Sequence, residues 1–138
     1  GKKEISELFL FGHIMKAPEM IAVDRDNKAG LIKLIHDAKD RIAQDRPIAM
    51  FPEGTRSKGD KILPFKACAS MVANKLKLKV QPIVMINTKP ILDSQNLSSQ
   101  SGSVKIIYLS PVQADRKTTW FKDTEENMRK IFMKEISK

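Results

Sequence analysis

The stretch from Ile48 to Ser57 reads Ile-Ala-Met-Phe-Pro-Glu-Gly-Thr-Arg-Ser. Its first part, residues 48–51, is short and apolar, which predicts a buried strand. Its second part is a polar turn that carries an acid, a base, hydroxyl groups, a glycine and a proline. In open α/β sheets, ligands bind just beyond the carboxyl ends of the strands, so we expect this turn to lie at a binding site.

A second apolar run, residues 20–23, lies upstream and ends just before a polar loop that contains Arg25. The helical spacing of apolar residues over residues 28–44 predicts a helix, and either Asp26 or Asn27 can cap its amino-terminal end. Strand, helix and strand together predict a βαβ unit with a right-handed crossover and a parallel strand pair. Both polar loops are then expected at the same edge of the sheet. The apolar positions at helical spacing are Leu31, Ile35, Ala38 and Ile42.

Further elements are predicted on either side of this unit. Residues 5–14 predict a helix, and the Ser-, Asn- and Gln-rich residues 89–103 predict a surface loop. The pattern as a whole predicts a single α/β domain over residues 1–138, with a mixed, largely parallel sheet flanked by helices. A helix is predicted after Pro64, with Ala69, Val72, Ala73 and Leu76 on one face, and strands are predicted at residues 80–87 and 104–109. A last helix is predicted to begin at a capping box of Asp123 and Glu126 and to carry the apolar residues Met128, Ile131, Phe132 and Ile136.

The composition is that of a globular protein with a strong positive charge. Of the 138 residues, 41% are hydrophobic and 30% are charged, and 25 Lys and Arg against 16 Asp and Glu give a net charge of +9. This charge favours phosphate-rich or acidic partners, although lysines that merely solvate helix faces are the alternative. The single cysteine, Cys68, excludes an internal disulfide and is typical of a reducing compartment. No run approaches the roughly 20 apolar residues that span a bilayer, and no signal-peptide pattern is present.

The two loop arginines, Arg25 and Arg56, are candidate phosphate ligands. A guanidinium group binds phosphate through two parallel hydrogen bonds, and a neighbouring glycine lets the backbone approach the ligand closely. Glu53 is then expected to position a hydroxyl group or a helix N-terminus, or to hold Arg56 in place. The alternative is that each arginine forms a surface ion pair with Asp24, Asp26 or Glu53.

The residues from Phe51 to Ser57 resemble the third signature block of the glycerolipid acyltransferases, and the other blocks flank it in the expected order. The chain is closest to the 1-acyl-sn-glycerol-3-phosphate (lysophosphatidate) acyltransferases of that family. Ile21-Ala22-Val23-Asp24-Arg25 is similar to the second block, Leu63-Pro64-Phe65-Lys66 resembles the continuation of the third, and Val80-Gln81-Pro82-Ile83-Val84 resembles the fourth.

The resemblance implies roles for particular residues. Arg25 and Arg56 match residues that hold the glycerol 3-phosphate group, and Lys66 adds positive charge nearby. Glu53, Gly54 and Thr55 match the substrate-binding turn of the third block, and the neighbourhood of Pro82 matches a block linked to packing or acyl-chain binding. Ala67 and Cys68 depart from the basic residue and glycine that are common after Pro-Phe-Lys. Neither a cofactor nor a metal is expected.

The resemblance also implies a catalytic histidine in a His-x4-Asp block. The histidine deprotonates the glycerol hydroxyl, and the aspartate orients the imidazole. Neither histidine of this chain fits, because Pro18 lies five positions after His13 and Arg41 lies five positions after His36. In family order the block lies upstream of Lys2. We therefore expect the chain to be an amino-terminally truncated domain with an incomplete sheet, and to be inactive by itself.

The implied reaction moves a fatty acyl group from a thioester of acyl carrier protein or coenzyme A to the free hydroxyl of lysophosphatidate, which gives phosphatidate. The alternative is a non-catalytic phospholipid-binding module. The basic charge favours contact with an anionic membrane surface, and the resemblance implies a place at the cytoplasmic face of a membrane. We expect no nucleic-acid partner, because the chain has one Trp, one Tyr and no nucleic-acid-binding motif.

Overall fold

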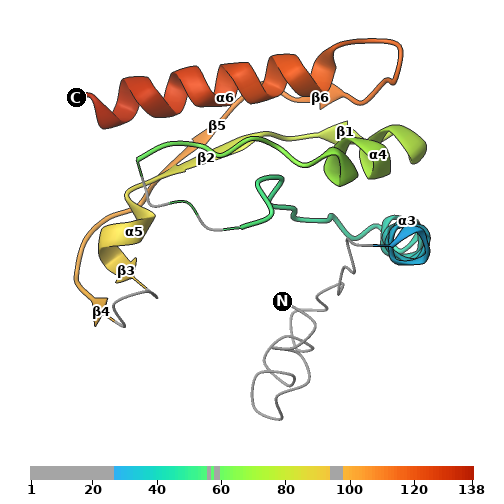
Figure 1. The fold of residues 1–138 in the computed structure, drawn as a ribbon, viewed down its shortest axis with the longest axis horizontal. Helices are drawn as coiled ribbons and strands as arrows, with labels where there is room; N and C mark the ends of the chain where they lie inside the picture. Colours follow the sequence, from blue (N-terminus) through green and yellow to red (C-terminus); the bar gives the residue numbers. More distant parts are fainter. Residues whose placement is uncertain (1–26, 56, 58–59, 94–97) are drawn as a thin grey trace. The chain divides into compact units, whose positions relative to one another are not determined.

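The computed structural model describes residues 27–55, 57, 60–93 and 98–138 (Figure 1). The chain divides into two compact units, Gly1–Met50 and Phe51–Lys138. The helix predicted at residues 5–14 and the strand predicted at residues 20–23 lie outside the described residues.

Helix α3, Lys28–Ala43, is the regular element in the described part of the first unit. Asn27 caps it, since its Oδ1 accepts a hydrogen bond of 2.6 Å from the backbone N–H of Gly30. The predicted helix and its cap are therefore confirmed. Leu34 and Ala38 are buried, whereas Ile42 is 37% exposed, so the buried stripe includes Leu34, which the predicted set omitted.

The strand predicted at residues 48–51 is not formed. The backbone there is irregular, and the side chain of Phe51 is 64% exposed. A buried strand needs a neighbouring strand for its hydrogen bonds and cover for its faces, and this segment has neither among the described residues. Every strand pair in the described residues is antiparallel, so a largely parallel sheet is not shown.

The second unit contains three antiparallel strand pairs. Strand β1, Lys79–Val80, pairs with β6, Val112–Gln113, and β2, Ile83–Ile86, pairs with β5, Lys105–Tyr108. The single strand predicted at residues 80–87 is thus divided at Gln81 and Pro82, because proline has no N–H to donate to a ladder. The predicted strand at residues 104–109 is confirmed as β5.

The segment predicted as a surface loop, residues 89–103, contains regular structure. Helix α5 covers Thr88–Ile91, and β3, Leu92–Asp93, pairs with β4, Ser98–Ser99. The prediction of a loop is therefore wrong for the residues that form α5, β3 and β4. Polar composition predicts exposure here, and it does not exclude a short hairpin.

Helix α6, Trp120–Ile136, packs against β2 and closes the main core (Figure 1). Phe132 of this helix forms a buried cluster with Val84 and Ile62. The helix begins before the predicted capping box, because Thr119 is its N-cap and Asp123 lies in its first turn, where it accepts a hydrogen bond of 2.8 Å from the Thr119 hydroxyl. On the other face of the strand pair, Ile83, Met85, Ile106 and Tyr108 are each at least 40% exposed.

Helix α4, Ala67–Lys75, joins α6 through a second buried cluster. Ala73 of α4 packs with Ala114 and Trp120. The indole Nε1 of Trp120 donates a hydrogen bond of 2.7 Å to Oδ1 of Asn74, which satisfies the polar atom of this buried ring. The predicted helix after Pro64 is confirmed, with Val72 and Ala73 on its buried side.

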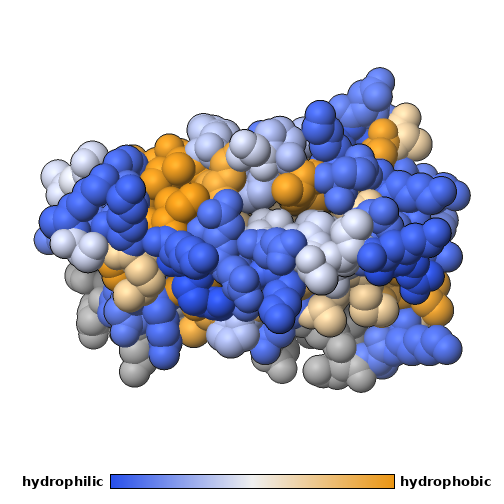
Figure 2. Space-filling view, turned by 90° about the horizontal axis from the view of Figure 1, so that it is seen from above, coloured by the Kyte–Doolittle hydropathy of each residue, from blue (hydrophilic) through white to orange (hydrophobic). Residues whose placement is uncertain are grey.

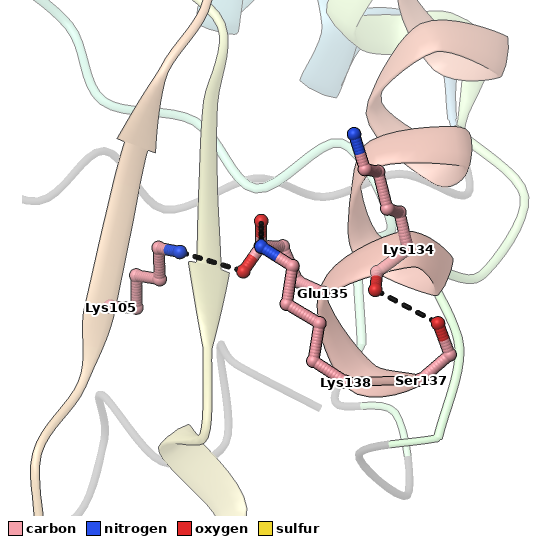
Figure 3. A network of polar contacts seen from close by, with 5 residues as sticks. All are labelled: Lys105, Lys134, Glu135, Ser137 and Lys138. Atoms are coloured by element: carbon pink, nitrogen blue, oxygen red, sulfur yellow. Dashed lines mark hydrogen bonds and ion pairs between the residues drawn. The ribbon is translucent and has the colours of Figure 1, made fainter.

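The carboxyl end of α6 is tied to β5 by an ion-pair network (Figure 3). Glu135 accepts a hydrogen bond of 2.7 Å from Lys105 Nζ and one of 2.9 Å from Lys138 Nζ. The hydrogen bond from Lys105, followed by that from Lys138, holds the pKa of Glu135 below its ordinary value. This network fixes the last turn of the helix beside the strand pair.

The face on which α6 lies is largely hydrophilic, with separate apolar patches (Figure 2). Lys122, Lys130 and Lys134 are exposed on this helix and contribute to the basic charge of the surface. Among the described residues, the helices fall short of the length and apolar character that crossing a bilayer requires.

Candidate functional site

The turn that follows Phe51 depends on one glycine. Gly54 has φ 72°, and its N–H donates a hydrogen bond of 3.1 Å to the carbonyl oxygen of Phe51. This left-handed conformation costs glycine little, because glycine has no Cβ to approach the carbonyl oxygen. Gly54 therefore allows the chain to reverse at this point, and it leaves Thr55 exposed beside the turn.

Glu53 connects the turn to a segment that lies further along the chain. Its Oε2 accepts a hydrogen bond of 2.7 Å from the backbone N–H of Leu63, and the contact is partly buried. A carboxylate that accepts from a backbone N–H forms one of the stronger hydrogen bonds in proteins. In the structure, then, Glu53 fixes the backbone that leads into α4.

Lys66 is joined to the same turn through its backbone. Its N–H donates a hydrogen bond of 2.8 Å to the carbonyl oxygen of Pro52. Lys66 is also the N-cap residue of α4, where no side-chain cap hydrogen bond is formed, and its own side chain is exposed. The amino-terminal end of α4, which carries partial positive charge, therefore lies beside the turn together with a lysine.

Helix α6 contacts this segment as well. Oε1 of Glu125 accepts a hydrogen bond of 3.1 Å from the backbone N–H of Phe65, and the ring of Phe65 lies 5.6 Å from that of Phe121, centroid to centroid. No motif in the sequence marks Glu125 as part of the site. Its one local signal is a Glu–Arg pair at i,i+4 with Arg129, and that pattern indicates a helix face without naming a partner.

Four of the six residues predicted for the site lie in the described part of the chain. Glu53 and Gly54 lie in the turn, Thr55 follows it directly, and the hydrogen bond from Lys66 to Pro52 brings Lys66 beside it. Arg25 and Arg56, predicted to hold phosphate, lie outside the described residues.

The predicted fourth block borders a shallow groove in the second unit. Pro82 is buried, and the groove beside it has a volume of about 390 Å³. Its lining is mainly apolar, with three hydroxyl groups and one amide. The lining residues are Pro82, Ile107, Tyr108, Leu109, Ser110, Val112, Thr124, Asn127 and Ile131.

The described histidine and the cysteine have ordinary structural surroundings. His36 is exposed on α3, and its Nδ1 lies 3.8 Å from Oδ1 of the adjacent Asp37. A hydrogen bond from Lys33 is the main cause that lowers the pKa of Asp37 from its ordinary value. Cys68 is a free, half-buried residue in the first turn of α4.

Comparison with known proteins identifies the family. The acyltransferase family profile matches residues 1–86, which include the turn and the segment that leads into α4. A 1-acyl-sn-glycerol-3-phosphate acyltransferase of Helicobacter pylori is 38% identical over 136 residues, which is 97% of this chain and 57% of that protein. Proteins of the same name from Salmonella typhimurium and Cocos nucifera are 33% and 30% identical, over 81% and 83% of this chain.

The chain spans 57% of the length of the Helicobacter protein, 45% of the Salmonella protein and 38% of the coconut protein. No solved structure gives a significant match. The family match covers more than half of the chain and includes the sequence motif at residues 51–57, and the Helicobacter relative aligns with nearly all of the chain. The chain therefore belongs to the acyltransferase family.

Proposed function

We propose that this chain forms the substrate-binding part of an enzyme that moves a fatty acyl group from a thioester to the free hydroxyl of lysophosphatidate, giving phosphatidate. Acyl carrier protein or coenzyme A carries the acyl group in this proposal. The names of the Helicobacter, Salmonella and coconut relatives support the acceptor substrate, and family membership supports acyl transfer. All 138 residues are assigned to one acyltransferase domain under this proposal.

The observation that carries the proposal is the pair of hydrogen bonds that joins the turn to the start of α4. Glu53 accepts from the N–H of Leu63, and the N–H of Lys66 donates to the carbonyl of Pro52. These contacts place a lysine and a helix N-terminus beside a glycine turn. Each of these features favours an anion, so together they support a site for the phosphate group of lysophosphatidate.

The roles of the individual residues follow from this placement. Lys66 supplies positive charge to the phosphate, and the substrate binds along Gly54 and the exposed Thr55. Glu53 acts on the substrate indirectly, because its carboxylate is bonded to the N–H of Leu63. We assign Arg25 and Arg56 to the same phosphate on the basis of the family motifs.

The general base is not assigned within residues 1–138. His13 and His36 each lack an aspartate five positions further on, and His36 is exposed on α3. We propose that these 138 residues bind substrate and transfer no acyl group by themselves. Acyl transfer by the purified 138-residue chain would overturn this part of the proposal.

The phosphate site is tested by substituting two lysines in turn: Lys66, the N-cap residue of α4, and Lys75, the last residue of that helix. Both variants are prepared in the intact protein, which contains these 138 residues together with the proposed general base. Lys66→Ala is expected to raise the KM for lysophosphatidate about tenfold or more, because a hydrogen bond to a charged group contributes roughly 1.5–3 kcal/mol. The KM for the acyl donor should stay within about twofold, a difference that corresponds to less than 1 kcal/mol. Lys75→Ala, at the exposed far end of α4, is the matched control and should change neither constant.

Two other outcomes would change the conclusion about Lys66 or about the function of the protein. Equal effects of Lys66→Ala on both substrates would indicate a structural role for Lys66. If the intact protein binds lysophosphatidate and transfers no acyl group, the non-catalytic phospholipid-binding module becomes the better description.

We also propose that the protein works at the cytoplasmic face of an anionic membrane. The net charge of +9 and the exposed lysines of α6 support this placement. Attraction between exposed charges weakens as salt shortens the Debye length. Binding of the intact protein to vesicles that contain anionic lipid should therefore fall steeply with salt, and binding that is insensitive to salt would contradict the placement.

A further inference from the structure

Glu125 makes two hydrogen bonds from the first half of α6. Its Oε1 accepts from the backbone N–H of Phe65 at 3.1 Å, and its Oε2 accepts from Nη2 of Arg129 at 3.0 Å. The side chain of Glu125 is 24% exposed and that of Arg129 is 35% exposed. Each carboxylate oxygen thus has its own partner, and the bond to Arg129 favours the orientation in which Oε1 accepts from Phe65.

The same helix also holds the side chain of Phe65. The rings of Phe65 and Phe121 are 5.6 Å apart and tilted by 52°, an arrangement that is favourable for aromatic pairs. Phe121, Glu125 and Arg129 are spaced four residues apart, so they lie along one face of α6. Phe65 is therefore fixed to α6 at two points, its backbone N–H and its ring.

Phe65 lies between the two residues that join the turn to α4. The N–H of Leu63 is bonded to Glu53, and the N–H of Lys66 is bonded to the carbonyl of Pro52. The three amides of Leu63, Phe65 and Lys66 thus attach one short segment to the turn on one side and to α6 on the other. A shift of Phe65 would move Lys66 and the start of α4 relative to the turn.

We propose that Glu125 is a positioning residue for the phosphate site, because its carboxylate holds the segment from Leu63 to Lys66 in the position that places Lys66 beside the turn. The inference rests on the proposed function. It extends that function to a helix outside the family match, which ends at residue 86. Glu125 touches no substrate in this proposal, and it acts through the backbone of Phe65.

The first test examines the hydrogen bond without reference to activity. Amide hydrogen exchange in the intact protein should be faster at Phe65 in Glu125→Ala by about tenfold or more, since a hydrogen bond to a charged acceptor contributes roughly that factor. Glu125→Gln retains an acceptor oxygen and should keep most of the protection. Glu126→Ala, an exposed neighbour on the same helix, is the matched control and should leave the exchange of Phe65 unchanged.

The second test separates positioning from general destabilisation. Steady-state kinetics of the intact protein are measured well below the unfolding midpoint of each variant. Glu125→Ala should raise the KM for lysophosphatidate by about fivefold to tenfold with little change in the KM for the acyl donor. This is less than the full effect of a charged hydrogen bond, because Glu125 acts on the site only through the backbone of Phe65. Glu125→Gln should restore the constant to within about twofold of the parent, a difference of less than 1 kcal/mol.

The outcomes distinguish this inference from the function on which it rests. If Lys66→Ala raises the lysophosphatidate KM and Glu125→Ala does not, Glu125 has no positioning role and the phosphate site stands. Equal changes in both KM values, or failure of Glu125→Gln to restore binding, would also overturn the inference. If Lys66→Ala itself has no effect, the proposed phosphate site fails, and the positioning role fails with it.

Discussion

The segment from Phe51 to Lys66 and the body formed by β2, β5 and α6 are stabilised in different ways. The described part of the segment contains no helix or strand, and its one residue in the buried cluster of the body is Ile62. Its backbone is held by hydrogen bonds within the segment, to Glu53 and Pro52, and by a hydrogen bond to Glu125 of α6. The body is held by buried apolar side chains, chiefly Val84 and Phe132. Removing a hydrogen-bond acceptor should therefore destabilise the segment, whereas removing side-chain volume should destabilise the body.

Removing volume from the body should have the largest effect on stability. Phe132→Ala is expected to lower the free energy of unfolding by about 3–5 kcal/mol, because it removes a ring from a packed cluster and leaves a cavity. Urea denaturation of the intact protein measures the change. Met133→Ala, on a side chain that is 46% exposed, is the control and should change the free energy by about 0.5 kcal/mol or less. A similar loss for both variants would mean that the body does not depend on this cluster.

Removing one acceptor from the segment should have the next largest effect. Glu53→Ala leaves the N–H of Leu63 without its partner in a partly buried place, which is expected to cost about 1–3 kcal/mol. Hydrogen exchange at Leu63, together with urea denaturation, detects the loss. Glu53→Gln keeps an oxygen that can accept the bond and should restore much of the protection. If alanine and glutamine behave alike, the hydrogen bond does not fix the segment.

A substitution at the turn should have a smaller effect. Gly54→Ala places a Cβ on a residue with φ 72°, which is expected to cost about 1–2 kcal/mol. Gly54→Asn should cost less, because asparagine adopts the left-handed region more readily than alanine does. Thermal unfolding of the three proteins gives the comparison. An alanine variant as stable as the parent would show that the turn tolerates another backbone conformation.

Removing the ion-pair network at the end of α6 should have the smallest effect on stability, and that effect should depend on pH. Lys105 and Lys138 hold the pKa of Glu135 below its ordinary value, so the unfolded chain takes up a proton first as the pH falls. The stabilisation is complete above the ordinary pKa of a glutamate, and it is lost as the pH falls through the folded pKa. Glu135→Gln should therefore weaken the protein at neutral pH and match the parent in acid. A difference between the two proteins that does not change with pH would contradict this assignment.

Local sequence patterns predicted the helices that are specified by residues close together in the sequence. Asn27 and the apolar spacing after it are sufficient to specify α3, and the small apolar residues after Lys66 indicate α4. The start of α6 was placed too late, because the contact of Trp120 with Asn74, which extends the buried face, joins residues far apart in the sequence. The strand predicted after Pro47 failed because its apolar residues have no partner strand among the described residues.

The sequence predicted which residues lie at the candidate site, but it did not predict the hydrogen bonds that join them. The motif identified Glu53, Gly54, Thr55 and Lys66, and the structure joins them through Leu63 and Pro52. The bond from Phe65 to Glu125 connects positions 60 residues apart, and no periodicity or motif indicates such a partner. Long-range hydrogen bonds of this kind depend on how α6 packs, which a sequence pattern does not specify.

The end of the family match has a practical consequence for anyone who prepares fragments of this protein. The match ends at residue 86, which is also the last residue of β2. The hydrogen-bonding partner of β2 lies at Lys105–Tyr108, and the side chain that covers Val84 belongs to Phe132. A fragment cut at residue 86 would keep the signature motifs but present an unpaired strand edge and an uncovered apolar side chain. Such edges recruit other chains, so we expect that fragment to precipitate during expression.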